Sequence, residues 1–307
     1  MAQITAALVK ELRDRTGAGM TDCKKALEAV AGDLDKAAEK LRMDGAAKAD
    51  KKASRTAAEG VIGIAQNAEA VALVEVNSET DFVAKGEDFR GLARLAAELA
   101  LKHRPASIEA LTALTEGGES LDTKRRNLVA KIGENLTIRR FDIVQKAGSD
   151  LALYVHPGDK IAVAVAMDNG GADLGKDLAM HAAAMSPRFL HGDAVPADVI
   201  EAERKIIDAQ IAQEQAEDEA AGKKAKPADI LAKMVDGKVR KFVAEITLLG
   251  QPFVKAEAHG MKADDSIEKV LKAKGAAVAR FVRFAVGEGI EKQQTDFASE
   301  VMAQVKQ

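Results

Sequence analysis

The sequence predicts an α+β protein in which helical segments and alternating strands occupy separate stretches of the chain. Apolar residues recur at helical spacing over residues 1–45 and 197–243, whereas runs such as VALVEV at 71–76 are rich in strand-forming residues. Apolar residues make up 47% of 307, enough for cores in two or three domains. We therefore expect an N-terminal three-helix module, a two-part α+β core with an inserted antiparallel helical hairpin, and a C-terminal helical module.

The first 45 residues are expected to fold as three short helices. Apolar residues at i, i+3 and i+4 place one apolar stripe on each helix. Residues 46–59 are rich in Ala and Lys and contain no large apolar residue, so they predict a linker or a solvated helical extension. The expected N-caps are Thr5, Thr21 and Asp33, and the expected helix ends lie at Gly17, Gly32 and Gly45.

Two α+β halves are expected to form the core, at residues 60–147 and 148–290. Each begins with two alternating runs that predict a hairpin, which turns at Asn67-Ala68 in the first half and at Pro157-Gly158 in the second. Each then continues through helical segments to a final strand. This shared order indicates an architectural duplication.

A helical hairpin is expected to interrupt the second half at residues 197–243. Pro196 and Pro227 stand at the two helix starts, where proline is tolerated. Residues 291–307 predict a C-terminal helix. Apolar residues at helical spacing are expected to face one another across the hairpin, namely Ile200, Ile207 and Ile211 against Ile230, Leu231, Met234 and Val235.

Charge balance and cysteine usage exclude several classes of function. Lys and Arg number 45 against 48 Asp and Glu, and this net charge of −3 argues against nucleic acid as the main partner, because phosphate binding needs a basic face. Cys23 is the single cysteine, so neither an internal disulfide nor a thiolate metal site can form. No uncharged apolar run approaches a membrane span, and we expect a cytoplasmic protein with no membrane partner.

Motifs that carry catalytic chemistry are missing from the sequence. It has no phosphate-binding G-x-x-x-x-G-K-[ST], no G-x-G-x-x-G after a strand, and no H-E-x-x-H, C-x-x-C or G-x-S-x-G. The five histidines are scattered, although His156 and His181 could converge with a carboxylate as a hydrolase site. The simpler interpretation makes His156 a turn residue and His181 a partly buried helix residue. We expect no catalytic residue, cofactor or metal.

The stretch VNSETDFVAK at 76–85 places a phenylalanine where the chain should turn after a strand. Aromatic residues make up only 3% of the chain, so a phenylalanine at a turn indicates a specific structural or functional role for Phe82. One interpretation is that Thr80 or Asp81 caps the next helix while Phe82 packs beneath it, because Thr and Asp are common N-caps. The related TDFA at 295–298 favours this interpretation, since it begins a predicted ordinary helix.

Six stretches, this one included, resemble the bacterial translation elongation factor Ts family and occur in the family's own order. They are LVKELRDRTGAGMTDCKKALE, TDFV within VNSETDFVAK, KIGENLTIRR at 131–140, YVHPGDKIAVAV, GQPFV at 250–254 and RFVRFAVGEGIEK at 280–292. The resemblance implies a guanine-nucleotide exchange factor for elongation factor Tu, and an N-terminal module similar to the ubiquitin-associated fold. It constrains residues 197–226 and 256–265 least.

The resemblance also implies which residues contact that partner. Asp81 and Phe82, with Thr80 and Val83 around them, would intrude near the Mg²⁺ side of its nucleotide domain, with Phe82 as a rigid wedge. Capping and wedging are compatible. Ile132 and Gly133 match positions beside this wedge, although Gly133 could simply end a helix. His156 and His181 match positions where the second half meets another domain of the partner.

Met20 lies in the contact region that the resemblance implies for the N-terminal module, although ordinary core packing is an alternative for it. The family often carries a second Met after this one, where this chain has Thr21.

Two other functions compete with exchange: a scaffold or chaperone-like binding module with no exchange activity, and the hydrolase described above. The helical hairpin could dimerise the complex or contact the partner.

Overall fold

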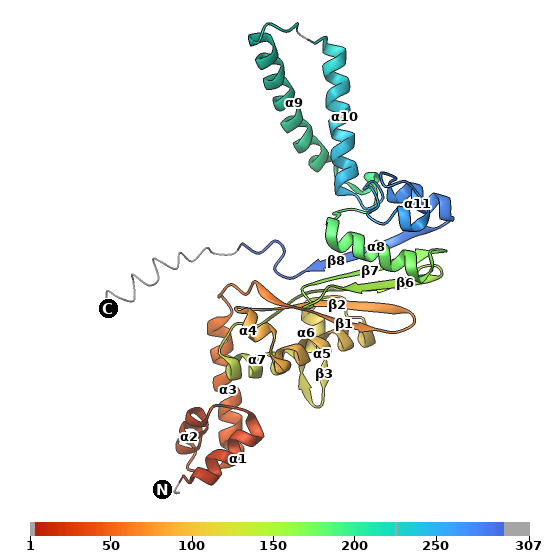
Figure 1. The fold of residues 1–307 in the computed structure, drawn as a ribbon. Coiled ribbons are helices and arrows are strands. Elements are labelled where there is room, and N and C mark those ends of the chain that lie inside the picture. The colour runs from red at the N-terminus through yellow and green to blue at the C-terminus, as the bar shows by residue number, and fades with distance from the viewer. Residues whose placement is uncertain (1–3, 225, 292–307) are drawn as a thin grey trace. The chain divides into compact units, whose positions relative to one another are not determined.

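The computed structural model describes residues 4–224 and 226–291 and confirms the predicted α+β class (Figure 1). The chain divides into two compact units. The first contains the chain up to Ile143, Val155–Ala162 and the residues from Phe284, and the second contains Val144–Tyr154 and Val163–Arg283. The finer module boundaries expected from the sequence stay a prediction. In the described parts of the chain, no helix is both long and apolar enough to cross a membrane.

Three helices open the first unit: α1 (Ala6–Thr16), α2 (Met20–Ala29) and α3 (Leu34–Lys52). Thr5 caps α1 and Asp33 caps α3, as predicted. The prediction for Thr21 is wrong, because α2 begins at Met20 and Gly19 stands at its N-cap without a side-chain bond. Cys23 is buried in the small core that these helices share, with Val9, Leu12, Ala26, Leu27 and Ala37.

The third helix runs past Gly45, where the sequence predicted its end, to Lys52. Gly45 is buried where α3 packs on α7 (Leu121–Ile132), and a Cβ at this position would lie 3.2 Å from that of Ala130. The glycine therefore permits a close helix crossing instead of ending the helix. Ala49, one turn further on, is buried in the core of the first unit.

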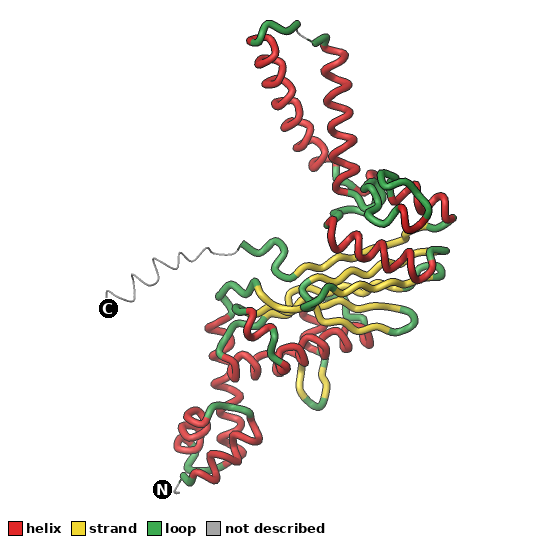
Figure 2. The backbone as a smooth tube through the Cα atoms, viewed as in Figure 1, coloured by secondary structure: helices red, strands yellow, loops and turns green. Residues whose placement is uncertain are grey.

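A three-stranded sheet in the order β1-β2-β5 forms the centre of the first unit. β1 (Glu59–Gln66) and β2 (Ala70–Ser78) form the predicted antiparallel hairpin, and the Asn67 side chain accepts the N–H groups of Glu69 and Ala70 in its turn. β5 is Thr137–Gln145. Helix α5 (Glu87–His103) packs against β1 and β2 (Figure 2). The shorter elements are α4 (Asp81–Ala84), α6 (Ile108–Ala113), β3 (Thr115–Glu116) and β4 (Glu119–Ser120).

Strand β2 is buried along its whole length and carries a charge at its centre. The Glu75 side chain is fully buried, and its carboxylate accepts Nη1 of Arg139 at 3.0 Å and Nε of Arg140 at 2.6 Å. The Gly287 N–H donates to the same carboxylate at 2.8 Å. Burial alone would raise the pKa of Glu75, but hydrogen bonds from Gly287, Asn77 and Arg140 lower it below its ordinary value.

The second unit repeats the strand order of the first. Its sheet has the order β6-β7-β8. β8 comes from much later in the chain and pairs with β7, the second strand of the hairpin, just as β5 pairs with β2 in the first unit. The bounds are β6 (Asp150–Val155), β7 (Ile161–Asp168) and β8 (Ala277–Ala285), with α8 (Gly171–Met185) and α11 (Ile267–Lys274), and short 3₁₀ helices at Gly192–Ala194 and Glu257–His259.

The predicted helical hairpin is formed by α9 (Ala197–Ala220) and α10 (Ala228–Ile246), which run antiparallel (Figure 1). Pro196 and Pro227 occupy the two N-caps. Four residues form its buried seam: Ile207, Ile211, Val235 and Val239. The prediction for Ile230 is wrong, because this residue is exposed near the start of α10, and the seam includes Val239, which the sequence analysis did not single out. The C-terminal helix expected at 291–307 lies outside the described residues, apart from Glu291.

Gly63 of β1 provides a test of how closely the first sheet and α5 approach. An alanine Cβ at this position would lie 2.2 Å from the Ala93 carbonyl oxygen, so backbone must move to admit it. We expect Gly63→Ala to lower the free energy of unfolding by about 2 kcal/mol or more in denaturant titrations of the full chain. Gly91→Ala is the matched control, because a Cβ there meets nothing within 4 Å. It should stabilise α5 by up to about 1 kcal/mol. Equal unfolding curves for the two variants would contradict this account of the interface.

Candidate functional site

The chain leaves β2 through a short turn that presents Phe82 to solvent. Thr80 caps the four-residue helix α4, and its hydroxyl accepts the Val83 N–H at 3.4 Å. The capping interpretation is therefore correct for Thr80. Packing of Phe82 beneath the helix is wrong, because 81% of this side chain is exposed, the highest fraction for a large apolar side chain among the described residues.

A carboxylate from another part of the chain holds Thr80. Glu134, just beyond the end of α7, accepts the Thr80 N–H at 3.0 Å and the Thr80 hydroxyl at 2.6 Å. The Ser78 hydroxyl donates to the Thr80 carbonyl at 2.9 Å, so the peptide groups on both sides of Thr80 are hydrogen-bonded. Thr80, at the start of α4, is thus hydrogen-bonded through its N–H, its carbonyl and its side-chain hydroxyl.

The neighbouring residues form the reciprocal contact. Glu79 accepts the Asn135 N–H at 2.6 Å and lies 3.5 Å from the Arg55 guanidinium. Asn135 is buried, and its side-chain amide donates to the Arg55 carbonyl at 2.7 Å. We call Glu79, Thr80, Glu134 and Asn135 the reciprocal clasp, because each of the two segments contributes a carboxylate to the backbone of the other.

Ile132 and Gly133 lie directly before the clasp. Gly133 has φ of 92° at the C-cap of α7 and donates its N–H to the Val129 carbonyl at 2.8 Å, so it does end a helix as one interpretation held. The Lys52 ammonium at the end of α3 donates to the Gly133 carbonyl. Ile132 is partly buried against the core of the first unit. The structure therefore brings Ile132, Gly133 and the TDFV motif together.

Asp81 keeps its negative charge near Phe82 at neutral pH. The Lys85 ammonium donates to Asp81 at 2.6 Å, and this hydrogen bond lowers the pKa of Asp81 below its ordinary value. The same ammonium lies 5.8 Å from the centroid of the Phe82 ring. Because both partners of the pair are well exposed, it contributes little to stability. The acid and the ring are thus available on one surface.

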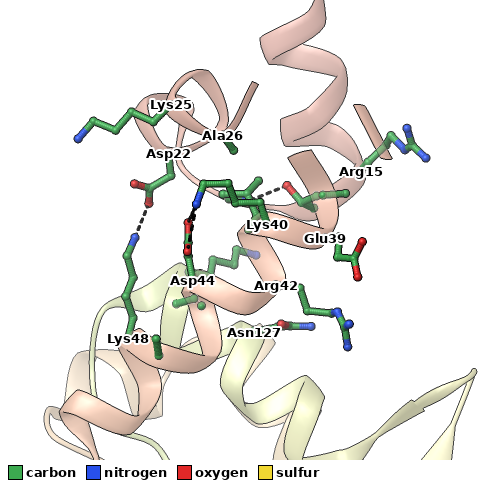
Figure 3. Close-up of a pocket in the computed structure, with 18 of the residues that line it drawn as sticks. Arg15, Asp22, Lys25, Ala26, Glu39, Lys40, Arg42, Asp44, Lys48 and Asn127 are labelled. Carbon is green, nitrogen blue, oxygen red and sulfur yellow. Dashed lines mark hydrogen bonds and ion pairs between the residues drawn. The ribbon is translucent and has the colours of Figure 1, made fainter. Parts of the chain in front are cut away.

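A charged cleft lies between the three N-terminal helices and α7 (Figure 3). Two ion pairs join charges that line it: Lys48 lies 2.9 Å from Asp22, and Lys40 lies 3.3 Å from Asp44. Met20 stands at the start of α2 with 48% of its side chain exposed, so the core-packing interpretation is wrong for it. Among the residues that the structure describes, no cluster of His, Cys, Asp and Glu is placed to hold a metal ion.

The two predicted histidines occupy different units. His156 belongs to the first unit and begins a tight turn, in which its N–H donates to the Ile161 carbonyl at 2.8 Å and its carbonyl accepts the Asp159 N–H at 3.0 Å. The interpretation of His156 as a turn residue beside Pro157 is confirmed. In the same unit, Asp159 lies 3.1 Å from the Arg90 guanidinium on α5.

His181 of α8, in the second unit, is buried with 3% exposed and uses both ring nitrogens. Nδ1 accepts the Val254 N–H at 3.3 Å, so Nε2 carries the proton and donates to the Gln251 side chain at 2.8 Å. Burial lowers the pKa of His181, which keeps the ring neutral. The ring therefore secures the GQPFV segment, and the solvent-exposed group at this position is the Val254 side chain.

Comparison with known proteins decides the family. A family model described as Elongation factor TS matches residues 79–288. Elongation factor Ts of Methylococcus capsulatus is 50% identical over 306 residues, which covers 99% of each chain. The protein of the same name from Francisella tularensis subsp. novicida is 50% identical over 307 residues and 100% of each chain, and that from Thioalkalivibrio sulfidiphilus is 48% identical over 305 residues and 99% of each. The chain belongs to the elongation factor Ts family.

Family membership makes the chain a translation elongation factor and confirms the resemblance drawn from its motifs. Sequence reasoning about the elongation factor Ts motifs missed the clasp. It singled out Thr80 and Gly133, but not Glu79, Glu134 or Asn135. A signal was available, because two acids beside two predicted chain reversals indicate carboxylates that accept backbone N–H groups. Which reversal each acid would reach across to depends on the tertiary fold.

The buried His181 predicts a pH dependence of stability in this elongation factor Ts chain. Its folded-state pKa lies below the ordinary value of 6.5, so the unfolded chain takes up a proton first as the pH falls. Stability from the neutral ring is therefore present above about pH 6.5 and is lost as the pH falls toward the folded-state pKa.

His181→Gln removes this titration. Between about pH 7.5 and 5.5, the free energy of unfolding should fall further for the wild type than for the variant, by up to about 1.4 kcal/mol. Denaturant titrations at each pH measure the difference. If both proteins lose the same free energy over this range, His181 does not control the dependence.

Proposed function

We propose that the chain is a guanine-nucleotide exchange factor that binds elongation factor Tu and promotes release of its GDP, so that GTP can bind during translation elongation. The single observation that supports this best is the exposed Phe82, held on a capped helical turn beside a charged Asp81. An aromatic ring loses little rotamer freedom on binding, and such anchors often dominate the energy of an interface. The action takes place in the cytoplasm.

The proposed mechanism disturbs the Mg²⁺ and phosphate end of the partner's GDP site. Mg²⁺ bridges phosphate oxygens to a GTPase, and it tolerates only near-octahedral geometry. Phe82 enters a pocket beside this site, and the carboxylate of Asp81 acts on the groups that hold the ion. Small displacements of the Mg²⁺ ligands then weaken GDP binding. The factor itself makes or breaks no covalent bond in this process.

A single wedge does not supply enough free energy for exchange. Shifting a conformational equilibrium from 1:99 to 99:1 takes about 5.5 kcal/mol of differential binding, and GDP weakens the factor's binding by as much as the factor weakens that of GDP. A broad interface must therefore support Phe82. We assign Ile132 and Gly133 to its edge, Met20 to a contact of the N-terminal helices, and His156 to a contact of the first unit. His181 acts indirectly, through the segment 251–254 that it holds.

Release of a fluorescent GDP analogue from elongation factor Tu, followed by stopped flow, tests this function. We expect the wild type to accelerate release by orders of magnitude. Phe82→Ala should slow the maximal rate at least about ten-fold, because truncating a central anchor costs on the order of 2 kcal/mol. Asp81→Ala should slow it less, since the carboxylate is partly screened by Lys85.

Ile206→Ala serves as the matched control for this experiment, because it truncates an exposed apolar side chain on α9. It should exchange as the wild type does. A Phe82→Ala variant that exchanges at the wild-type rate would remove the wedge from the mechanism. A wild-type protein that binds elongation factor Tu without releasing nucleotide would favour a binding scaffold instead.

A further inference from the structure

The contact between Glu134 and Thr80 determines how Phe82 is presented. Thr80 gives two hydrogens to one carboxylate: its N–H to Oε2 at 3.0 Å and its hydroxyl to Oε1 at 2.6 Å. The same hydroxyl oxygen accepts the Val83 N–H, which is the N-capping bond of α4. A hydroxyl has one hydrogen, and directing that hydrogen to Glu134 leaves a lone pair facing Val83. The carboxylate therefore sets the orientation that makes the cap possible.

Helix α4 depends on such outside support. It has only four residues, and a single turn is unstable on its own because nucleation fixes many torsions for few hydrogen bonds. Its ring at Phe82 contributes no burial to hold it, since that side chain is exposed. Its interior contacts are those of the buried Ala84 and the partly buried Val83.

Glu134 is itself attached to a fixed base. The next residue, Asn135, is buried and bonded through its N–H to Glu79 and through its side chain to the Arg55 carbonyl. On the other side, the carbonyl of Gly133 accepts the Lys52 ammonium. Both peptide neighbours of Glu134 are thus held, so its carboxylate is positioned before any partner arrives.

We propose that Glu134 is a positioning residue for nucleotide exchange: its carboxylate, by chelating Thr80, orders α4 and holds Phe82 in the orientation that enters the partner. This inference rests on the proposed function. Glu134 acts through Phe82 and need not touch the nucleotide site itself. Removing the Glu134 carboxylate leaves the rest of the interface in place but lets Phe82 move. We therefore expect this removal to lower the exchange rate more than the affinity for the partner. Preorganised side chains of this kind reduce the ordering cost at the moment of binding.

A double-mutant cycle between Glu134 and Phe82 tests the inference, with the full chain and release of a fluorescent GDP analogue from elongation factor Tu as the readout. Glu134→Ala alone should lower the maximal rate at saturating factor about five- to ten-fold and change the half-saturating concentration less than about two-fold. In the Phe82→Ala background the same substitution should change the maximal rate less than about two-fold, because there is no ring left to position.

Conservative variants separate positioning from general damage to the fold. Thr80→Ser keeps both donors to Glu134 and should exchange faster than Thr80→Val, which keeps only the backbone N–H donor and loses the capping hydroxyl. Glu134→Gln offers one acceptor oxygen in place of two, so its rate should lie between those of the wild type and Glu134→Ala. Glu98→Ala removes an exposed carboxylate from α5 and controls for the change of charge.

Each outcome of this cycle has a defined meaning. The inference is overturned if Glu134→Ala exchanges like the wild type, or if it slows exchange equally with and without Phe82. It is also overturned if only the half-saturating concentration changes, because Glu134 would then be an ordinary contact residue. If the wild type does not accelerate release at all, the proposed function fails, and the role of Glu134 in exchange fails with it. Acceleration by the wild type with no coupling leaves the function standing without this residue.

Discussion

The reciprocal hydrogen bonds between residues 79–80 and 134–135, in which each segment supplies a carboxylate acceptor, are the interaction on which the rest of the site depends. β2 is buried along its whole length, and where the chain leaves it for the surface, the backbone N–H and C=O groups still need hydrogen-bond partners. Here the Glu134 carboxylate accepts hydrogen bonds from the N–H and the hydroxyl of Thr80, and the Glu79 carboxylate accepts one from the N–H of Asn135. The two carboxylates thereby join the end of the central strand to the end of α7, and α4 is built on that junction.

A second buried carboxylate stabilises the same strand from its middle. Glu75 would be costly to bury alone, but two guanidinium groups from β5 and the Gly287 N–H compensate its charge. This arrangement ties β2 to β5 and to the residues that follow Phe284, all within the first unit. The sheet beneath the site is therefore fixed by directional bonds as well as by apolar packing, and it provides a rigid support for the turn.

Periodicity was sufficient to predict most of the fold. Alternation located the hairpins at Asn67 and Pro157, and helical spacing with proline starts located α9 and α10. Prediction failed where tertiary contacts override local signals. Gly45 is a typical helix end, but its missing side chain lets α3 cross α7 closely, and Ile230 is exposed although its spacing predicted a place in the hairpin seam. Local propensity contains no information about such partners.

The candidate site was predictable only in part, for the same physical reason. The motif TDFV and the glycine at 133 are local signals, and the structure brings them together. Whether Phe82 faced inward or outward could not be decided from a turn and a cap alone. The role of Glu134 depends on a bond between residues 54 positions apart. His181 likewise is buried, although the resemblance implied that it contacts the partner.

Amide hydrogen exchange in the free protein, resolved by residue, tests the central claim that α4 is ordered before the partner binds. The account predicts that the Thr80 and Asn135 amides exchange at least about 100-fold more slowly than unstructured ones, and that adding elongation factor Tu changes this protection little. Rapid exchange of both amides in the free protein, with protection only in the complex, would contradict it. The turn would then be shaped by its partner, and the clasp would be a result of binding.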